Sequence, residues 1–314
     1  MSKYKIFVDG AEGTTGLRIR ERLAPREDLS LITLSEELRK DLNARLKAIS
    51  EADVSILCLP DAAAIEIVQA AGNNSRICDT STAHRTNTKW VYGFPEIAGR
   101  RSKIAASNKV AVPGCHSTGF LALAAPLVET GALNKNAQTS CHSITGYSGG
   151  GKKMIAEYQN PNRSEIYSSP RLYALGMQHK HLPEMKAVSG LDAPPLFCPV
   201  VADYYSGMLV SLPLLAKDLA PQYQNIKALS DLLNDYYKNE ALIKVHSPGY
   251  MPDDGTINAQ GMYGKDSLEI FVTGNSEQIL LNAWFDNLGK GASGAAVQCM
   301  NIMLGLEETT GLHF

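Results

Sequence analysis

The chain has 314 residues. Chains of this length usually form more than one hydrophobic core, so we expect two domains. Hydrophobic residues make up 44% of it and charged residues 20%, a composition typical of a soluble globular protein. The net charge of −2 provides no basic surface for nucleic acid, and no apolar run approaches the roughly 20 residues that span a bilayer. Partners of both kinds are therefore not expected.

Six cysteines are scattered along the chain without a Cys-x-x-Cys pair. This distribution argues against a disulfide scaffold and a structural zinc site, so we expect no metal and a reducing, cytoplasmic location. The sequence enters a predicted strand at Tyr4, which leaves no room for a signal peptide.

The first predicted elements are a strand over Tyr4–Val8 and a helix over about Thr15–Leu23, joined by a glycine-rich loop. Three glycines with the spacing Gly-x-x-Gly-x-x-Gly form a variant of the dinucleotide fingerprint, in which the pyrophosphate lies at the helix N-terminus. Any tight strand-to-helix turn uses glycines too, which is the alternative. The cofactor-binding residues predicted in this loop are Gly10, Gly13, Thr14, Thr15 and Gly16.

Strands and helices then alternate, which predicts a parallel, doubly wound α/β sheet of the Rossmann type. The predicted elements are strands Leu29–Leu34, Asp53–Leu59, Ser75–Asp79 and Ile104–Val112, and helices Glu37–Ile49 and Ala62–Ala71. Ligands of such sheets bind at the carboxyl ends of the strands. We therefore add Cys58, Leu59 and Pro60 to the cofactor-binding residues.

The residues after the second strand bear on the choice between NAD and NADP. Ser35 comes first, with Arg39 and Lys40 one turn later, and neutral or basic groups there favour the 2′-phosphate of NADP. Glu36 and Glu37 leave NAD open, because an acidic residue at this place binds the ribose hydroxyls.

The segment Thr80–Arg85 is polar and is predicted to be a loop at the same edge of the sheet. Arg85 is a candidate to bind a phosphate or carboxylate through both ends of its guanidinium group. It could equally be a solvated surface residue.

Cys115 follows Pro113-Gly114 and begins a predicted helix over Cys115–Leu127. The unpaired N–H groups and the dipole of a helix N-terminus favour the thiolate, which is the reactive form of cysteine. The alternative is a buried apolar cysteine, a common state for this residue.

The remaining elements predict a second, α+β domain with a mostly antiparallel sheet, followed by an apolar helix that returns to the first domain. These elements are strands Gln138–Thr145, Leu196–Val201, Met208–Leu214, Ser267–Thr273 and Gln278–Trp284, and helices Ile226–Tyr237 and Ala295–Leu304. The predicted domains are 1–114 with about 287–314, which bind NADP, and 115–286, which bind substrate and form a homo-oligomer. In the second domain, the Ser-Gly-Gly-Gly turn at 148–151 exposes backbone N–H groups that suit an anion, although an ordinary flexible turn has the same composition.

Two histidines and a glutamate lie within six residues at His179, His181 and Glu184. Histidines two residues apart cannot share one face of a helix, and no third ligand lies nearby, so zinc is not expected. The cluster is typical of an acid/base group.

Together these stretches resemble the short-chain type of the N-acetyl-γ-glutamyl-phosphate reductase family, within the aspartate-semialdehyde dehydrogenase superfamily, over nearly the whole chain. The motifs that carry the resemblance are Gly-Ala-Glu-Gly-Thr-Thr-Gly at 10–16, Asp-Thr-Ser-Thr-Ala-His-Arg at 79–85, Val-Pro-Gly-Cys-His-Ser-Thr-Gly at 112–119, Gln-His-Lys-His-Leu-Pro-Glu at 178–184 and Lys-Gly-Ala-Ser-Gly-Ala-Ala-Val-Gln at 290–298. The cysteine and histidine motifs are specific; the glycine motif alone is not.

The resemblance implies reduction of the acyl phosphate N-acetyl-γ-glutamyl phosphate with NADPH, in arginine biosynthesis. It implies that Cys115 is the nucleophile that forms a thioester, and that His181 rather than His179 is the acid/base, although spacing does not separate the two. Asn287 is implied to bind the nicotinamide amide. The predicted substrate-binding residues are Arg85, Ser148, Gly149, His179 and Glu184.

Two other functions are compatible with the sequence. Another acyl-phosphate reductase, such as aspartate-semialdehyde dehydrogenase, would use the same chemistry with a different substrate pocket. A non-catalytic, NADP-binding redox sensor would use the same fold, since a fold does not determine a function. Cys115 and His181 in their motifs argue against the sensor.

Overall fold

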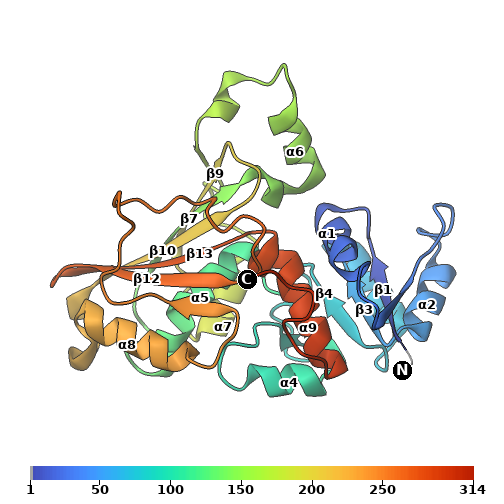
Figure 1. Ribbon diagram of the computed structural model, residues 1–314, viewed down its shortest axis with the longest axis horizontal. Helices are drawn as coiled ribbons and strands as arrows, with labels where there is room; N and C mark the ends of the chain where they lie inside the picture. The colour runs from blue at the N-terminus through green and yellow to red at the C-terminus, as the bar shows by residue number, and fades with distance from the viewer. Residues whose placement is uncertain (1–2) are drawn as a thin grey trace. The chain divides into compact units, whose positions relative to one another are not determined.

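The computed structural model describes residues 3–314, which form two compact units (Figure 1). The first comprises the residues up to Gly114 together with Ala292–His313, and the second comprises Cys115–Gly291 with Phe314. Met1 and Ser2, the start of the stretch in which we expect no signal peptide, lie outside the described residues. Within residues 3–314, no helix has both the length and the apolar character needed to cross a membrane.

The first unit is built on a six-stranded sheet in the order β2-β1-β3-β4-β6-β5, in which every neighbouring pair is parallel. Its strands are β1 (Tyr4–Asp9), β2 (Leu29–Ile32), β3 (Val54–Leu57), β4 (Ile77–Asp79), β5 (Val91–Tyr92) and β6 (Lys109–Ala111). The chain runs outward from β1 to β2 and then returns to β3 on the other side of β1. The carboxyl ends of β1 and β3 therefore flank the point where ligands of such sheets bind.

The helices of the first unit are α1 (Thr14–Leu23), α2 (Leu42–Glu51), α3 (Asp61–Ala71), α4 (Arg100–Ala106) and α9 (Gly294–Leu304). The last of these comes from the end of the chain and packs against β3, β4, α1 and α4. Every residue of α9 is buried, which explains its small and apolar composition. Arg26 fixes it further by donating from Nη1 to Asn301 Oδ1 at 2.6 Å.

Two predicted boundaries in this unit are wrong. The strand predicted over Ile104–Val112 is the end of α4 followed by the short β6, because Ile104 is a single buried residue on an otherwise exposed helix. The helix predicted over Glu37–Ile49 begins at Leu42, where the Asp41 side chain accepts from the Ala44 N–H at 2.7 Å and caps the first turn. The second error reflects a side-chain hydrogen bond, which apolar periodicity does not report.

The second unit contains a seven-stranded sheet in the order β11-β12-β13-β10-β7-β9-β8. Its strands are β7 (Ser140–Gly146), β8 (Arg171–Leu172), β9 (Leu196–Ala202), β10 (Met208–Leu215), β11 (Ile243–Val245), β12 (Leu268–Gly274) and β13 (Gln278–Phe285). Four of the six neighbouring pairs are antiparallel, and β7–β9 and β11–β12 are parallel. The predicted fold class, an α/β Rossmann-type domain and an α+β domain with a mostly antiparallel sheet, is confirmed.

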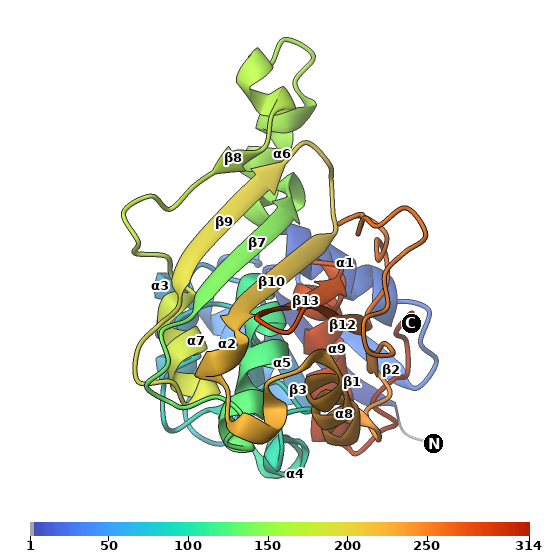
Figure 2. The same ribbon diagram turned by 90° about the vertical axis from the view of Figure 1, so that its left-hand side faces the viewer.

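One face of this sheet is covered by α5 (Cys115–Glu129) and α8 (Ile226–Tyr237), with α7 (Leu182–Ser189) packed against α5. Figure 2 faces the other side, where β9, β7 and β10 lie in front of α5 and α6 (Gly151–Gln159) lies beyond the strand ends. Gly119 allows α5 to lie against the sheet, because a Cβ there would come within 2.5 Å of Val210 and 2.8 Å of Phe285. Shorter helical turns are Tyr147–Gly150, Glu165–Ser168, Ala216–Asp218, Pro221–Tyr223 and Gly289–Ser293.

Candidate active site

The candidate nucleophile, Cys115, is the first residue of α5, as its position after Pro113-Gly114 predicts, and its side chain is half-buried. The next twelve residues of the helix are fully buried, so the N-terminus of α5 is rigidly held. Gly291 lies directly behind Cys115, since a Cβ at that glycine would come within 2.9 Å of the Cys115 Cβ. A side chain at position 291 would therefore displace the thiol.

The two histidines of the 178–184 motif lie in the turn that leads into α7, close to the first turn of α5. The His181 N–H donates to His179 Nδ1 at 3.2 Å, and Ser117 Oγ donates to the His181 carbonyl at 3.5 Å. His181 Nε2 lies 3.9 Å from Glu184 Oε1, and both of these side chains are buried. The carboxylate of Glu184 therefore lies beside the imidazole of His181.

His116, the residue after Cys115, contacts two hydroxyl groups through its ring nitrogens. Its Nδ1 lies 2.6 Å from Ser143 Oγ and its Nε2 lies 2.6 Å from the Tyr173 hydroxyl. The ring centroid lies 5.4 Å from that of His179 and 5.5 Å from that of His181. Burial, reinforced by the charges of His179 and of Lys180, lowers the pKa of His116 to about 3.

Sequence reasoning missed the Ser143–His116–Tyr173 contacts. Ser143 lies in the middle of β7, and Tyr173 follows the two-residue β8 in a segment with no clean periodicity. Only the position of His116 directly after the cysteine could have drawn attention to it. The contacts themselves join residues 27 and 57 positions apart, and no local pattern reports them.

Ser148, Gly149 and Asn287 form a separate group in the second unit. Asn287 Nδ2 donates to Ser148 Oγ at 3.0 Å, while Asn287 Oδ1 accepts from Ser206 Oγ at 3.1 Å and from the Gly207 N–H at 2.8 Å. Ser206 also donates to Asp286, which is buried beside it. The oxygen of Asn287 is therefore engaged within its own unit, and the glycine after Ser148 is exposed.

The glycine loop of the first unit lies against the end of β3 and borders a cavity of about 510 Å³. Gly10 has φ +80°, and a Cβ there would come within 2.3 Å of the Cys58 carbonyl oxygen. A Cβ at Gly16 would come within 2.4 Å of the Gly10 carbonyl oxygen. Both positions require glycine, so the loop can bring its backbone close to a ligand. Thr14 Oγ1 is buried and has no hydrogen-bond partner among residues 3–314.

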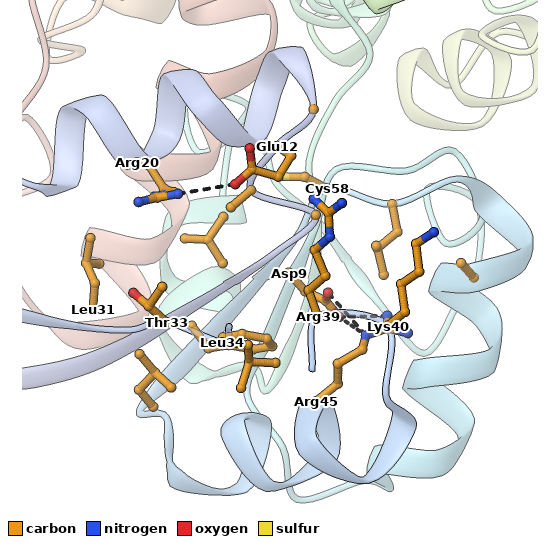
Figure 3. A pocket seen from close by; sticks show the side chains of 18 of the residues that line it. Asp9, Glu12, Arg20, Leu31, Thr33, Leu34, Arg39, Lys40, Arg45 and Cys58 are labelled. Atoms are coloured by element: carbon orange, nitrogen blue, oxygen red, sulfur yellow. Dashed lines mark hydrogen bonds and ion pairs between the residues drawn. The ribbon is translucent and has the colours of Figure 1, made fainter. Parts of the chain in front are cut away.

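Basic side chains gather on one side of this cavity (Figure 3). Arg39, Lys40 and Arg45 line it, and Arg45 is fixed by three hydrogen bonds to Asp9, of which the shortest, Nη2 to Oδ2, is 2.7 Å. Burial raises the pKa of Asp9, and the Arg45 guanidinium partly offsets this effect. On another side, Arg20 forms an ion pair with Glu12 at 3.4 Å.

Several predicted cofactor-binding residues line this cavity and others do not. Gly10, Gly13, Cys58, Leu59 and Pro60 are part of its wall. Burial raises the pKa of the Cys58 thiol to about 12, so this cysteine is unreactive. After β2, which ends at Ile32, the lining residues are Thr33 and Leu34 rather than Ser35. Gly16, Thr14 and Thr15 lie behind the wall, in the first turn of α1.

Arg85 lies in the first unit, and its guanidinium group donates hydrogen bonds to backbone carbonyls. Nε donates to the Val112 carbonyl at 2.9 Å and Nη2 donates to the Thr80 carbonyl at 2.9 Å. These carbonyls follow the carboxyl ends of β6 and β4, so Arg85 ties together the loops after two strands. Within residues 3–314, no group of three or more His, Cys, Asp or Glu side chains is arranged to hold a metal ion.

Comparison with known proteins identifies both sequence relatives and a shared fold. Residues 115–287 match the family described as semialdehyde dehydrogenase, dimerisation domain. N-acetyl-gamma-glutamyl-phosphate reductase 2 of Nostoc sp. is 43% identical over 325 residues, covering 99% of this chain and 100% of the relative. The N-acetyl-gamma-glutamyl-phosphate reductase of Brucella ovis is 42% identical over 311 residues, covering 96% and 99%.

Solved structures share the fold at low sequence identity. Aspartate semialdehyde dehydrogenase II of Vibrio cholerae, complexed with ASA, superimposes with a TM-score of 0.72 at 16% identity, over 97% of this chain and 99% of that one. The aspartate semialdehyde dehydrogenase of Candida albicans, solved with NADP, gives a TM-score of 0.65 at 15% identity, over 96% and 99%.

Proposed function

The chain belongs to the family of the N-acetyl-gamma-glutamyl-phosphate reductases, and we propose that it reduces N-acetyl-γ-glutamyl phosphate to N-acetylglutamate 5-semialdehyde with NADPH, a step of arginine biosynthesis. Identity of 42–43% over nearly the full length of the relatives supports this reaction and confirms the predicted family. The observation that carries the proposal is the cysteine at the first residue of α5 beside a buried His181–Glu184 pair.

Acylation of Cys115 is the first step. The helix N-terminus stabilises the thiolate, which attacks the carbonyl carbon of the acyl phosphate. A C–S bond forms, the C–O bond to phosphate breaks, and inorganic phosphate leaves with the electron pair of that bond. The product is a thioester on Cys115, a better hydride acceptor than a carboxylate.

Proton supply is the task proposed for His181. NADPH would supply the hydride that reduces the thioester carbonyl. The imidazolium of His181 donates a proton to the oxygen on which negative charge develops, and Glu184 stabilises the charged ring. Return of that proton and release of the Cys115 thiolate yield the aldehyde. His179, which accepts from the His181 backbone, is proposed to bind the substrate.

The first unit fits a dinucleotide cofactor. At Gly10 and Gly16 the backbone lies where a Cβ would collide with neighbouring backbone atoms, and the Thr14 hydroxyl is a buried polar group without a partner among residues 3–314. These features suit the pyrophosphate of NADP(H). Arg39 and Lys40 would bind the 2′-phosphate, since no carboxylate follows β2 in the wall of the cavity.

Three further parts of the predicted site also have proposed roles. The backbone N–H groups of the exposed Gly149 turn, with Ser148 beneath them, are proposed for the phosphate or carboxylate. Arg85 is proposed to shape the loops after β4 and β6 around the substrate. The Asn287 amide nitrogen donates one of its two hydrogens to Ser148, and the other is proposed to bind the nicotinamide amide.

Oligomer formation is supported by the family match of the second unit. The sheet face opposite α5 carries exposed apolar side chains, among them Ile144 on β7, Leu172 on β8, Leu215 on β10 and Leu280 on β13. We propose that a second copy of the chain covers this face. Replacement of Ile144 by Glu should lower the mass measured by light scattering, whereas an unchanged mass would refute the assignment.

A comparison of substrates tests the proposed reaction. The purified protein is assayed in the oxidative direction with NADP⁺ and phosphate, using N-acetylglutamate semialdehyde and aspartate semialdehyde in parallel. Higher kcat/KM for the acetylated compound is expected. Preference for aspartate semialdehyde would assign the chain to the other acyl-phosphate reductase, and turnover of neither would favour a redox sensor.

A further inference from the structure

His116 has no part in the reaction above, although it adjoins Cys115. Its ring is fully enclosed between two hydroxyl groups, Ser143 Oγ at Nδ1 and the Tyr173 hydroxyl at Nε2, each at 2.6 Å. Phe197 closes one side, with ring centroids 5.2 Å apart. Both contacts are within hydrogen-bond distance, so each ring nitrogen is engaged as a donor or as an acceptor.

The ring of His116 is neutral at any pH near 7. Burial lowers its pKa to about 3, and the charges of His179 and Lys180 act in the same direction. A neutral imidazole donates from one nitrogen and accepts at the other, so exactly two arrangements of protons are possible for Ser143, His116 and Tyr173.

Ser143 distinguishes the two arrangements. It is completely buried in the middle of β7, and its hydroxyl has His116 as its sole hydrogen-bond partner in the described part of the chain. If Nδ1 donated to Ser143, the hydroxyl proton of that serine would be buried without an acceptor. If Ser143 donates to Nδ1, every polar group is satisfied, as buried groups almost always are. Nε2 of His116 then carries the ring proton and donates to the Tyr173 oxygen.

This assignment leaves the Tyr173 hydroxyl proton free to donate elsewhere. The side chain of Tyr173 is only half-buried, and its position is fixed by its own N–H, which donates to the Pro199 carbonyl at 3.1 Å. Burial, and then the negative charge of Cys115, raise the pKa of the Tyr173 hydroxyl. The hydroxyl therefore keeps its proton, and it lies 2.6 Å from the ring of His116, the residue that directly follows Cys115 in α5.

We propose that His116, held by Ser143 as the Nε2–H tautomer, is a positioning residue that directs the Tyr173 hydroxyl proton toward the negative charge at Cys115. With the other tautomer, Tyr173 would donate to His116 and contribute nothing to the thiolate. Ser143, which is buried in the sheet, thus acts through His116 to fix the direction in which the Tyr173 hydroxyl donates at the reacting thiol. The inference rests on the proposed function only in taking Cys115 as the reacting group.

Other charged groups also surround this chain of hydrogen bonds. His179 and His181 have ring centroids 5.4 and 5.5 Å from that of His116, Lys180 lies between them in the sequence, and Glu184 faces His181. A change in the charge of any of these groups would also change how strongly the thiolate form of Cys115 is stabilised. A test must therefore separate the contribution of the Tyr173 hydroxyl from that of the histidines.

The tautomer is measured directly on the wild-type protein. Long-range ¹H–¹⁵N correlation spectra of protein labelled at histidine distinguish protonated from bare ring nitrogens. For the His116 ring, identified by its loss in His116→Gln, we expect a protonated Nε2 and a bare Nδ1 across the neutral pH range. A protonated Nδ1 would overturn the proposal. The measurement needs neither substrate nor cofactor, so its result is independent of the proposed reaction.

The consequence for the thiol is measured by the pH dependence of alkylation at Cys115, followed by mass spectrometry of its peptide. In Tyr173→Phe the thiolate loses a donor, so alkylation at neutral pH should slow about three- to tenfold and its pH profile should move to higher pH. Ser143→Ala should shift the profile in the same direction by less. Ser211→Ala, which removes a 2.6 Å bond to Asn282 in the neighbouring strand, is the matched control and should match wild type. An unshifted profile in Tyr173→Phe would refute the role.

Discussion

The two units handle polar chemistry in opposite ways. The cavity of the first unit combines an apolar lining with several charged side chains and a glycine loop, and a Cβ added at Gly10 of this loop would collide with the Cys58 carbonyl after β3. The start of α5 in the second unit is surrounded by buried side chains whose hydrogen bonds are mostly neutral. Charges on flexible side chains suit the capture of an anionic ligand, whereas a fixed neutral network suits the control of one reactive thiol.

This difference determines how each region responds to substitution. In the first unit, where the glycine loop packs closely against neighbouring backbone, a single added methyl group should disrupt the cavity. In the second unit, where the buried hydrogen-bond network is neutral, adding a proton to it should lower the stability of the fold. Side chains that bind through exposed charge should show the smallest effects, because solvent screens them.

The largest effect is expected for Gly10→Ala in the first unit. The new Cβ would come within 2.3 Å of the Cys58 oxygen at φ +80°, so we expect a loss of about 3 kcal/mol in the free energy of unfolding and loss of NADPH binding. Gly99→Ala is the matched control, since its backbone is left-handed with φ +71° and nothing lies within 4 Å of the new Cβ. It should cost only about 1 kcal/mol. Equal losses, measured by urea denaturation, would contradict the close approach.

An intermediate effect is expected from acid at His116. Its pKa is lowered to about 3 in the folded protein from 6.5, so the unfolded chain binds the proton first and stability falls as pH drops below 6.5. The wild type should lose about 2 kcal/mol more than His116→Gln between pH 7 and pH 5. Denaturation curves at both pH values measure this difference. Parallel losses in the two proteins would show that His116 is not the group held neutral.

The smallest effect is expected for the basic residues of the first cavity. Arg39→Ala should raise the KM for NADPH about tenfold and leave the KM for NADH unchanged, since one charge-assisted contact at an exposed site is removed. Lys47→Ala, on the exposed face of α2 and outside the cavity wall, is the control. Equal rises for both cofactors would show that Arg39 does not contact the 2′-phosphate.

The contrast between the units also explains what the sequence predicts. The glycine loop and the cysteine at the start of α5 are local signals, because a tight turn and a helix start require particular residues at adjacent positions. The alternation of strands and helices predicts the parallel sheet of the first unit for the same reason. Family resemblance then indicates the reaction, and the relatives confirm it.

The contacts around His116 could not be predicted. Ser143 reaches this ring from β7 and Tyr173 from the residue after β8, and the placement of those strands is decided by long-range packing rather than by any spacing in the sequence. The same holds for Asp9 and Arg45, which lie 36 residues apart. The start of α2 escaped prediction because the side chain of Asp41, rather than apolar periodicity, determines it.

The central claim is that Cys115 is acylated by the substrate before reduction. The most direct measurement mixes the protein with N-acetyl-γ-glutamyl phosphate in the absence of NADPH, quenches the mixture in acid and maps the adduct by mass spectrometry. We expect a burst of phosphate close to one equivalent per chain and an N-acetylglutamyl group on the Cys115 peptide, both missing in Cys115→Ser. An adduct on another residue, or steady turnover in Cys115→Ser when NADPH is added, would contradict the mechanism.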